Sequence, residues 1–141
     1  MGPTGCTTAS LAGSLTNENG AAGSVYYTLV LTNHGSAACI LQGWPGVSFV
    51  TGSGGQQVGA AARRFPGTAS AITVAPGQGA GAELQITQAS NYGTPCQITP
   101  VTGLRIYPPN QTGALFVAHT DQACANTSDV TLQVGPFKAL G

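Results

Sequence analysis

Alternation of hydrophobic and polar positions runs through most of this chain and predicts β-strands. In residues 24–33, SVYYTLVLTN, every second side chain points to the same face, and both faces carry β-branched or aromatic residues. A segment that is apolar on both faces belongs in the interior of a sheet. Residues 9–16 alternate more weakly and predict an edge strand, joined to 24–33 through a turn at 17–20, Asn-Glu-Asn-Gly.

Glycine and proline punctuate the rest of the chain at short intervals. The Gly-rich stretch 52–55 predicts a hairpin between its flanking strands, and residues 76–79, Pro-Gly-Gln-Gly, separate two more strands. Helix signals are nearly absent, because glycine or proline interrupts most windows and none shows an apolar period of 3.6 residues. Further strands are expected at residues 39–42, 47–51, 56–60, 71–75, 80–87, 104–107, 114–118 and 130–134.

Four cysteines, with no Cys-x-x-Cys spacing, fit disulfides better than a zinc or redox site. The last two lie symmetrically about Asn110, in a turn between the strand-like segments 103–107 and 114–118. In an antiparallel hairpin they fall opposite each other beyond its open end. The first two bracket the other predicted hairpin, and four reduced cysteines in a cytosolic protein are the alternative. The favoured pairing, one of three, is Cys6–Cys39 and Cys96–Cys124.

Short strands at regular spacing are typical of a sandwich of two sheets. The expected fold is therefore all-β, an immunoglobulin-like β-sandwich of about 8–9 strands with two disulfides. A closed barrel is the alternative. Residues 6–137 are expected to form the single domain, with 1–5 as a disordered extension and 138–141 as a C-terminal tail.

The chain carries almost no charge. Charged residues make up 6% of its 141 residues, against roughly 25% in ordinary globular proteins. Four basic residues cannot form the cation cluster that nucleic acid or an anionic membrane surface requires, so we expect neither as a partner. No apolar run reaches the length of a membrane span. The disulfides indicate a secreted or extracytoplasmic location, with a lipid anchor on the full-length precursor as one option.

Candidate catalytic groups are few. A hydrolytic triad needs a histidine oriented by an acid against a nucleophile, and only His34 and His119 are available. His119 and Asp121 share one side of an extended segment, but two ligands are too few for structural zinc, so no metal and no cofactor are expected. Asp121 and Asp129 lie either side of Cys124 and could approach each other, as the two carboxylates of a glycosidase do. We expect no catalytic residues; a secreted hydrolase using Asp121 and Asp129, with His119, is the alternative.

Aromatic and arginine side chains supply the candidate binding residues. Tyr26 lies on one face of its strand, and Arg105 and Tyr107 share a face of theirs. If the two strands belong to one sheet, these three side chains form an exposed amphipathic patch suited to recognition. Trp44, which precedes a proline, is expected in or near the core, and a sugar-stacking platform is the alternative.

Several phrases of the sequence, taken in order, resemble one known family. That family is DUF4232, a domain of unknown function found in secreted proteins and lipoproteins of actinobacteria. The resemblance runs from residue 6 to residue 136 and implies an exported β-sandwich, often attached to the envelope, with no catalytic residues to transfer. Trp44 stands where the family usually has tyrosine. The matching phrases are 23–27 (GSVYY), 31–33 (LTN), 39–49 (CILQGWPGVSF), 75–77 (APG), 104–109 (LRIYPP) and 132–136 (LQVGP).

These observations favour a non-catalytic secreted or cell-envelope module that binds a protein or a glycan of the envelope. With four basic and four acidic residues, long-range electrostatic steering is weak. Recognition should therefore depend on aromatic and hydrogen-bonding contacts at close range.

Overall fold

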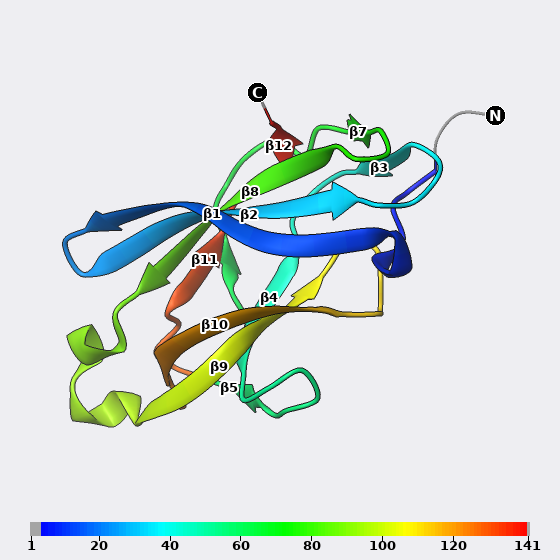
Figure 1. Cartoon of the computed structure of the whole chain (residues 1–141). Coiled ribbons are helices and arrows are strands. Elements are labelled where there is room, and N and C mark those ends of the chain that lie inside the picture. Colours follow the sequence, from blue (N-terminus) through cyan, green and yellow to red (C-terminus); the bar gives the residue numbers. More distant parts are fainter. Residues whose placement is uncertain (1–3, 141) are drawn as a thin grey trace.

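A computed structural model describes residues 4–140, which fold into two facing β-sheets and a small two-stranded one (Figure 1). Three short 3-10 helices accompany the strands: η1 (Thr8–Ser10), η2 (Ala89–Tyr92) and η3 (Thr94–Cys96). The strands are β1 (Leu11–Ala21), β2 (Ser24–Asn33), β3 (Cys39–Leu41), β4 (Gly46–Val50), β5 (Gln57–Val58), β6 (Arg63–Arg64), β7 (Ile72–Val74), β8 (Gly79–Thr87), β9 (Ile98–Tyr107), β10 (Leu115–Cys124), β11 (Leu132–Val134) and β12 (Lys138–Ala139).

The two main sheets form the layers of a sandwich. The six-stranded sheet has the order β1-β2-β8-β11-β6, and β12 also pairs with β8. The four-stranded sheet has the order β10-β9-β4-β5, and β3 pairs with β7 in the small sheet. This arrangement confirms the predicted all-β sandwich with two disulfides and is not a closed barrel. Two strands were not predicted, β6 and β12, because two residues are too few to show alternation.

The core lies between the inner faces of the two main sheets. Leu29 on β2 and Leu84 on β8 are fully buried there, facing Phe49 on β4 and Leu104 and Ile106 on β9. Burying each such side chain contributes roughly 1.5–3 kcal/mol relative to leaving it in water. The central position predicted for 24–33 is confirmed, because β2 lies between β1 and β8, and β1 is the edge strand.

The turn of the first hairpin is not where the sequence placed it. β1 and β2 are connected at Ala22 and Gly23, where Gly23 has a φ of 76° that favours glycine. Of the predicted turn residues, 17 and 18 instead lie in a β-bulge between Thr16 and Asn19, in which Asn17 has a φ of 54°, and 19 and 20 pair with β2. Asparagine tolerates this left-handed conformation, so the same signal that suggested a turn is used to bend a continuous strand.

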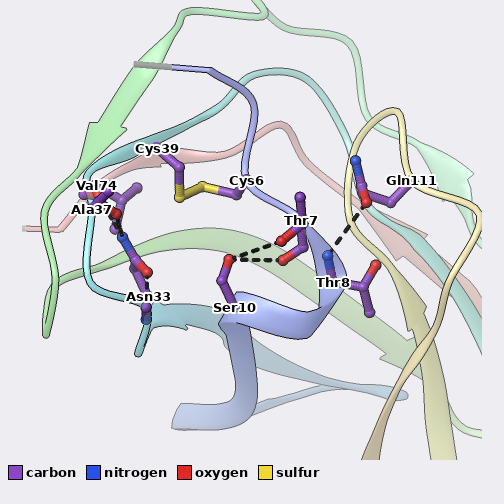
Figure 2. Close-up of a disulfide and its surroundings, with 10 residues drawn as sticks. Cys6, Thr7, Thr8, Ser10, Asn33, Ala37, Cys39, Val74 and Gln111 are labelled. Atoms are coloured by element: carbon purple, nitrogen blue, oxygen red, sulfur yellow. Dashed lines mark hydrogen bonds between the residues drawn. A yellow bond between two sulfur atoms is a disulfide. The ribbon is translucent and has the colours of Figure 1, made fainter.

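The first disulfide attaches the segment before η1 to β3 (Figure 2). The sulfur atoms of Cys6 and Cys39 lie 2.00 Å apart. Next to them the buried amide of Asn33, the last residue of β2, donates to the carbonyls of Ala37 and Val74 at 2.9 and 3.0 Å. The disulfide and these two hydrogen bonds together hold the small β3–β7 sheet against the end of the large one.

The second disulfide joins η3 to the end of β10. Cys96 and Cys124 are both buried, with their sulfur atoms 1.97 Å apart. Cys124 pairs with Ile98 at the open end of the β9–β10 hairpin, where the sequence predicted the link. Both predicted pairings are therefore confirmed, and all four cysteines are used.

Both ends of the described chain are tied into the sheets, where the sequence suggested loose ends. Ile40 donates its N–H to the carbonyl of Thr4 at 2.8 Å, and Gly5 forms a bridge to the same strand, β3. Residues 138–139, expected in a C-terminal tail, form β12 and pair with β8. The rest of the two predicted extensions, residues 1–3 and 141, lies outside the described residues.

Replacing Cys96 and Cys124 together by alanine should lower the free energy of unfolding by about 3–4 kcal/mol. The disulfide closes a loop with a sequence separation of 28, and opening it restores entropy to the unfolded chain. The Cys6/Cys39 double alanine variant, with a separation of 33, should lose a similar amount. Urea denaturation followed by fluorescence of Trp44 measures both; losses below about 1 kcal/mol would show that the disulfides do not stabilise the fold.

Candidate functional site

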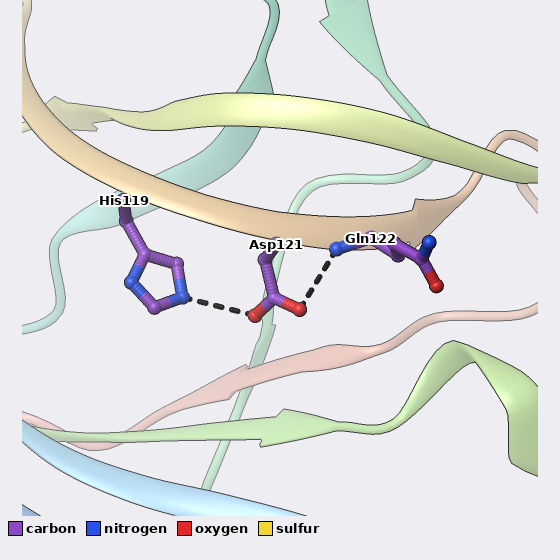
Figure 3. Close-up of polar contacts among 3 residues, drawn as sticks. All are labelled: His119, Asp121 and Gln122. Atoms are coloured by element: carbon purple, nitrogen blue, oxygen red, sulfur yellow. Dashed lines mark hydrogen bonds and ion pairs between the residues drawn. The ribbon is translucent and has the colours of Figure 1, made fainter.

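His119 and Asp121 project from β10 into the space between the two main sheets. Inward and outward side chains alternate along β10, and a bulge opposite β9 lies between Ala118 and Asp121. The Nε2 atom of His119 lies 2.9 Å from Oδ2 of Asp121, and the Gln122 N–H donates to Oδ1 at 2.8 Å (Figure 3). The two side chains are 15% and 34% exposed, so the pair sits at the margin of the core.

Two residues of the opposite sheet complete this group. The ring of Tyr27, on the inner face of β2, meets the His119 ring edge to face, with centroids 5.4 Å apart. Burial raises the pKa of Tyr27, and the negative charges of Glu18 and Asp121 and a hydrogen bond to Glu18 raise it further. We call Glu18, Tyr27, His119 and Asp121 the inter-sheet polar cluster, because it connects β1 and β2 to β10.

The polar cluster has the histidine and the acid of a hydrolytic triad but, among the described residues, no nucleophile bonded to that histidine. Within residues 4–140 no hydroxyl or thiol is hydrogen-bonded to His119, and every cysteine is in a disulfide. Both carboxylate oxygens of Asp121 already accept hydrogen bonds. Asp129 lies in the turn after β10, and the contacts of the described chain do not link its carboxylate to His119 or Asp121. The same residues contain no group of three potential metal ligands.

The predicted patch of Tyr26, Arg105 and Tyr107 does not form, because its strands belong to different sheets. Tyr26 is on β2 of the six-stranded sheet, whereas Arg105 and Tyr107 are on β9 of the four-stranded sheet. Arg105 donates to the Gly55 carbonyl and so anchors the β4–β5 loop. Tyr107 is 38% exposed and packs over Gly46. Alternation showed which face each residue takes, but it could not show which sheet.

Trp44 is not a free stacking platform. It is partly buried against the core, and its Nε1–H donates to the Phe65 carbonyl at 2.9 Å. The guanidinium of Arg64 lies over its ring, 5.3 Å from the centroid. The core position expected from the sequence agrees with these contacts, which also fix the chain around β6.

A hollow on the outer face of the six-stranded sheet was not anticipated from the sequence. Two cavities of about 880 Å³ and about 450 Å³ meet at Thr28 and Glu83, which are direct cross-strand partners on β2 and β8. We call these two adjoining cavities together the outer groove. The first cavity is lined by Asn17, Glu18, Asn19, Tyr26, Tyr27, Thr28 and Glu83. The second is lined by Thr28, Phe65, Pro66, Gly81, Glu83, Gly135, Pro136, Lys138, Ala139 and Leu140.

A glycine shapes the middle of the outer groove. A Cβ atom at Gly81 would lie 2.7 Å from Cγ2 of Thr28 and 2.9 Å from Cδ2 of Leu140. Only glycine therefore leaves room for these neighbours to pack without a shift. Of the three predicted binding residues, Tyr26 lines this groove, but with Thr28 and Glu83 as neighbours instead of Arg105 and Tyr107. Cross-strand register brings these side chains together, and periodicity along a single strand does not reveal it.

The chain belongs to the family described as Domain of unknown function (DUF4232), whose match covers residues 6–138. This confirms the family expected from the sequence phrases. No curated protein and no solved structure matches the chain. In the described part of the chain, none of the helices has the length and apolar character needed to cross a bilayer.

Replacing Tyr27 by phenylalanine should flatten the loss of stability at alkaline pH. The pKa of Tyr27 is raised in the folded state, so the unfolded chain loses this proton first as the pH rises. The stabilisation is complete below about pH 10, the ordinary tyrosine pKa, and is lost as the pH rises through the folded value. Urea denaturation between about pH 9 and 11 measures the slope, and identical slopes for the wild type and the variant would contradict the raised pKa.

Proposed function

We propose that this domain is a non-catalytic, extracytoplasmic module that binds a protein or a glycan through its outer groove. The observation that carries the proposal is that the two cavities adjoin each other across β2 and β8, where Thr28 and Glu83 line both. Cavities of roughly 300–1,000 Å³ with a few polar groups are the usual form of ligand sites in proteins.

The side chains in the groove suit recognition at short range. Tyr26 and Phe65 offer apolar area, and Asn17 and Asn19 offer amide donors and acceptors. Glu83 is exposed and, within residues 4–140, forms no ion pair. A neutral chain gains little from electrostatic steering, so these local contacts would supply the specificity.

Two disulfides in 141 residues support a location outside the cytoplasm, where thiols are oxidised. The resemblance of the sequence to secreted proteins and lipoproteins favours the same location and an envelope attachment. A partner in the cell envelope, protein or glycan, is therefore the proposed ligand class.

A secreted hydrolase is the second candidate, favoured by the contact between His119 and Asp121. The pair has the distance of a base with its orienting acid. With no nucleophile bonded to His119 in the described chain, such an enzyme would have to activate a water molecule. Asp129, which was expected to take part, has no described link to the pair.

Replacing Thr28 by tryptophan should fill the junction of the two cavities and weaken ligand binding at least about tenfold, because the bulky ring blocks both. Thr120→Trp is the matched control: the same substitution, at an exposed position of β10 on the other sheet. Glycan arrays and displayed peptide libraries supply the ligands, and thermal denaturation checks folding. Equal binding by Thr28→Trp and the wild type would refute the proposal that ligands bind in the outer groove.

The hydrolase is tested by an Asp121→Asn, Asp129→Asn double variant on chromogenic ester and glycoside substrates. We expect no turnover above background by the wild type. If the wild type turns over a substrate and the folded double variant does not, the protein is a hydrolase and the proposal of a non-catalytic binding module is wrong.

A further inference from the structure

The sheet opens at one corner, where two prolines stop a ladder of hydrogen bonds. β6 and β11 run parallel, and the last bond between their segments is donated by the Phe65 N–H to the Val134 carbonyl at 2.8 Å. The next residue after Phe65 is Pro66, and Pro136 follows shortly after Val134 on the other side. Proline has no N–H to donate, so the ladder cannot continue past either residue.

Beyond the prolines the two chain segments separate and leave a slot. Gly67 still lies against Pro136: a Cβ atom added at this glycine would lie 3.0 Å from Cγ of the proline ring. Further along, a cavity of about 410 Å³ lies between Thr68 and Ser70 on one side and Lys138 and Ala139 on the other. This slot adjoins the outer groove, because Lys138 and Ala139 line both.

Backbone groups on both walls of the slot are available for pairing. Within the described chain β12 pairs only with β8, so its second edge has no strand partner. Neighbouring residues of an antiparallel strand point their N–H and C=O groups to opposite sides, so one of the two β12 residues presents both groups to the slot. On the facing wall, the N–H groups of residues 67–71 donate no hydrogen bond to any described residue, whereas the Ala69 carbonyl already accepts one from the Gln42 side chain at 2.9 Å.

The adjoining cavity offers one charge of each sign beside apolar walls. Glu83 and Lys138 both line it, and neither forms an ion pair within residues 4–140. Phe65 and Leu140 line the same cavity, and Leu140 is 49% exposed. Two of the chain's few charged side chains thus line a recess that also contains Phe65 and Leu140, which suits an apolar residue with a basic and an acidic neighbour.

We propose that the slot receives an extended segment of a partner protein, which adds to the sheet as a strand along β12. The segment places an apolar side chain between Phe65 and Leu140, a basic side chain near Glu83 and an acidic one near Lys138. This inference rests on the proposed binding function and narrows its ligand to a peptide strand. The free residue of β12 presents one N–H donor and one C=O acceptor side by side, the pair that one residue of an added peptide strand matches.

Short, unconstrained random peptides displayed on phage and selected against the whole domain provide the ligands. Selected peptides should share an apolar residue with lysine or arginine close by. Synthetic copies carrying one N-methyl group at each position in turn should lose about tenfold in affinity at the one position whose N–H pairs with β12, while the adjacent positions change little. Peptides selected for binding to the Glu83→Gln variant should no longer favour lysine or arginine beside the apolar residue. Peptides selected on Asp129→Asn, the matched control outside the groove, should still favour them.

Three results would overturn the strand addition. They are failure to enrich any peptide, indifference of the selected peptides to N-methylation, and an unchanged basic preference with Glu83→Gln. If peptides fail but glycans bind the wild type and lose affinity for Thr28→Trp, the binding module stands and only the peptide strand is refuted. If neither peptides nor glycans bind, both the module and the strand addition are refuted.

Discussion

Aliphatic side chains packed between the six-stranded and four-stranded sheets determine where every other part of this domain lies. Leu29 and Leu84 on one side and Leu104 and Ile106 on the other exclude water from the centre of the sandwich. Because apolar side chains occupy the inner faces of both sheets, most polar side chains lie at the margin of the core or on the outer faces. The disulfides then restrain the two regions with least core of their own, the small β3–β7 sheet and the 3-10 helices before β9.

The few charged residues are placed where the sandwich leaves space. Asp121 lies at the margin between the sheets and holds His119 toward Tyr27, which links β10 to β2. Glu18 belongs to the same inter-sheet polar cluster and also lines the outer groove, as Glu83 does. The chain has only four acidic residues, and two of them line this one groove. The outer face of the six-stranded sheet therefore carries a local concentration of negative charge. Within the described chain the His119–Asp121 pair has no hydrogen-bonded nucleophile beside it, and the outer groove is where we propose that a ligand binds.

Much of the fold could be predicted from sequence because it depends on short-range rules. Alternation located the long strands, and the symmetry of Cys96 and Cys124 about a turn identified their hairpin and their disulfide. These rules failed where the structure depends on which residues are neighbours in space. Asn17 satisfies a bulge as well as a turn, and alternation could not place Tyr26 and Tyr107 in separate sheets. The outer groove escaped prediction for the same reason: it depends on the cross-strand register of β2, β8 and β12.

The central claim is that ligands bind the outer face of the six-stranded sheet. The most direct measurement is amide chemical-shift mapping of the isotopically labelled domain with a bound ligand from the glycan or peptide selections. The account predicts one contiguous stripe of perturbed amides across residues 17–19, 26–28, 81–83 and 138–140. Perturbations centred instead on Tyr107 and Phe116, the exposed aromatic residues of the four-stranded sheet, would contradict it.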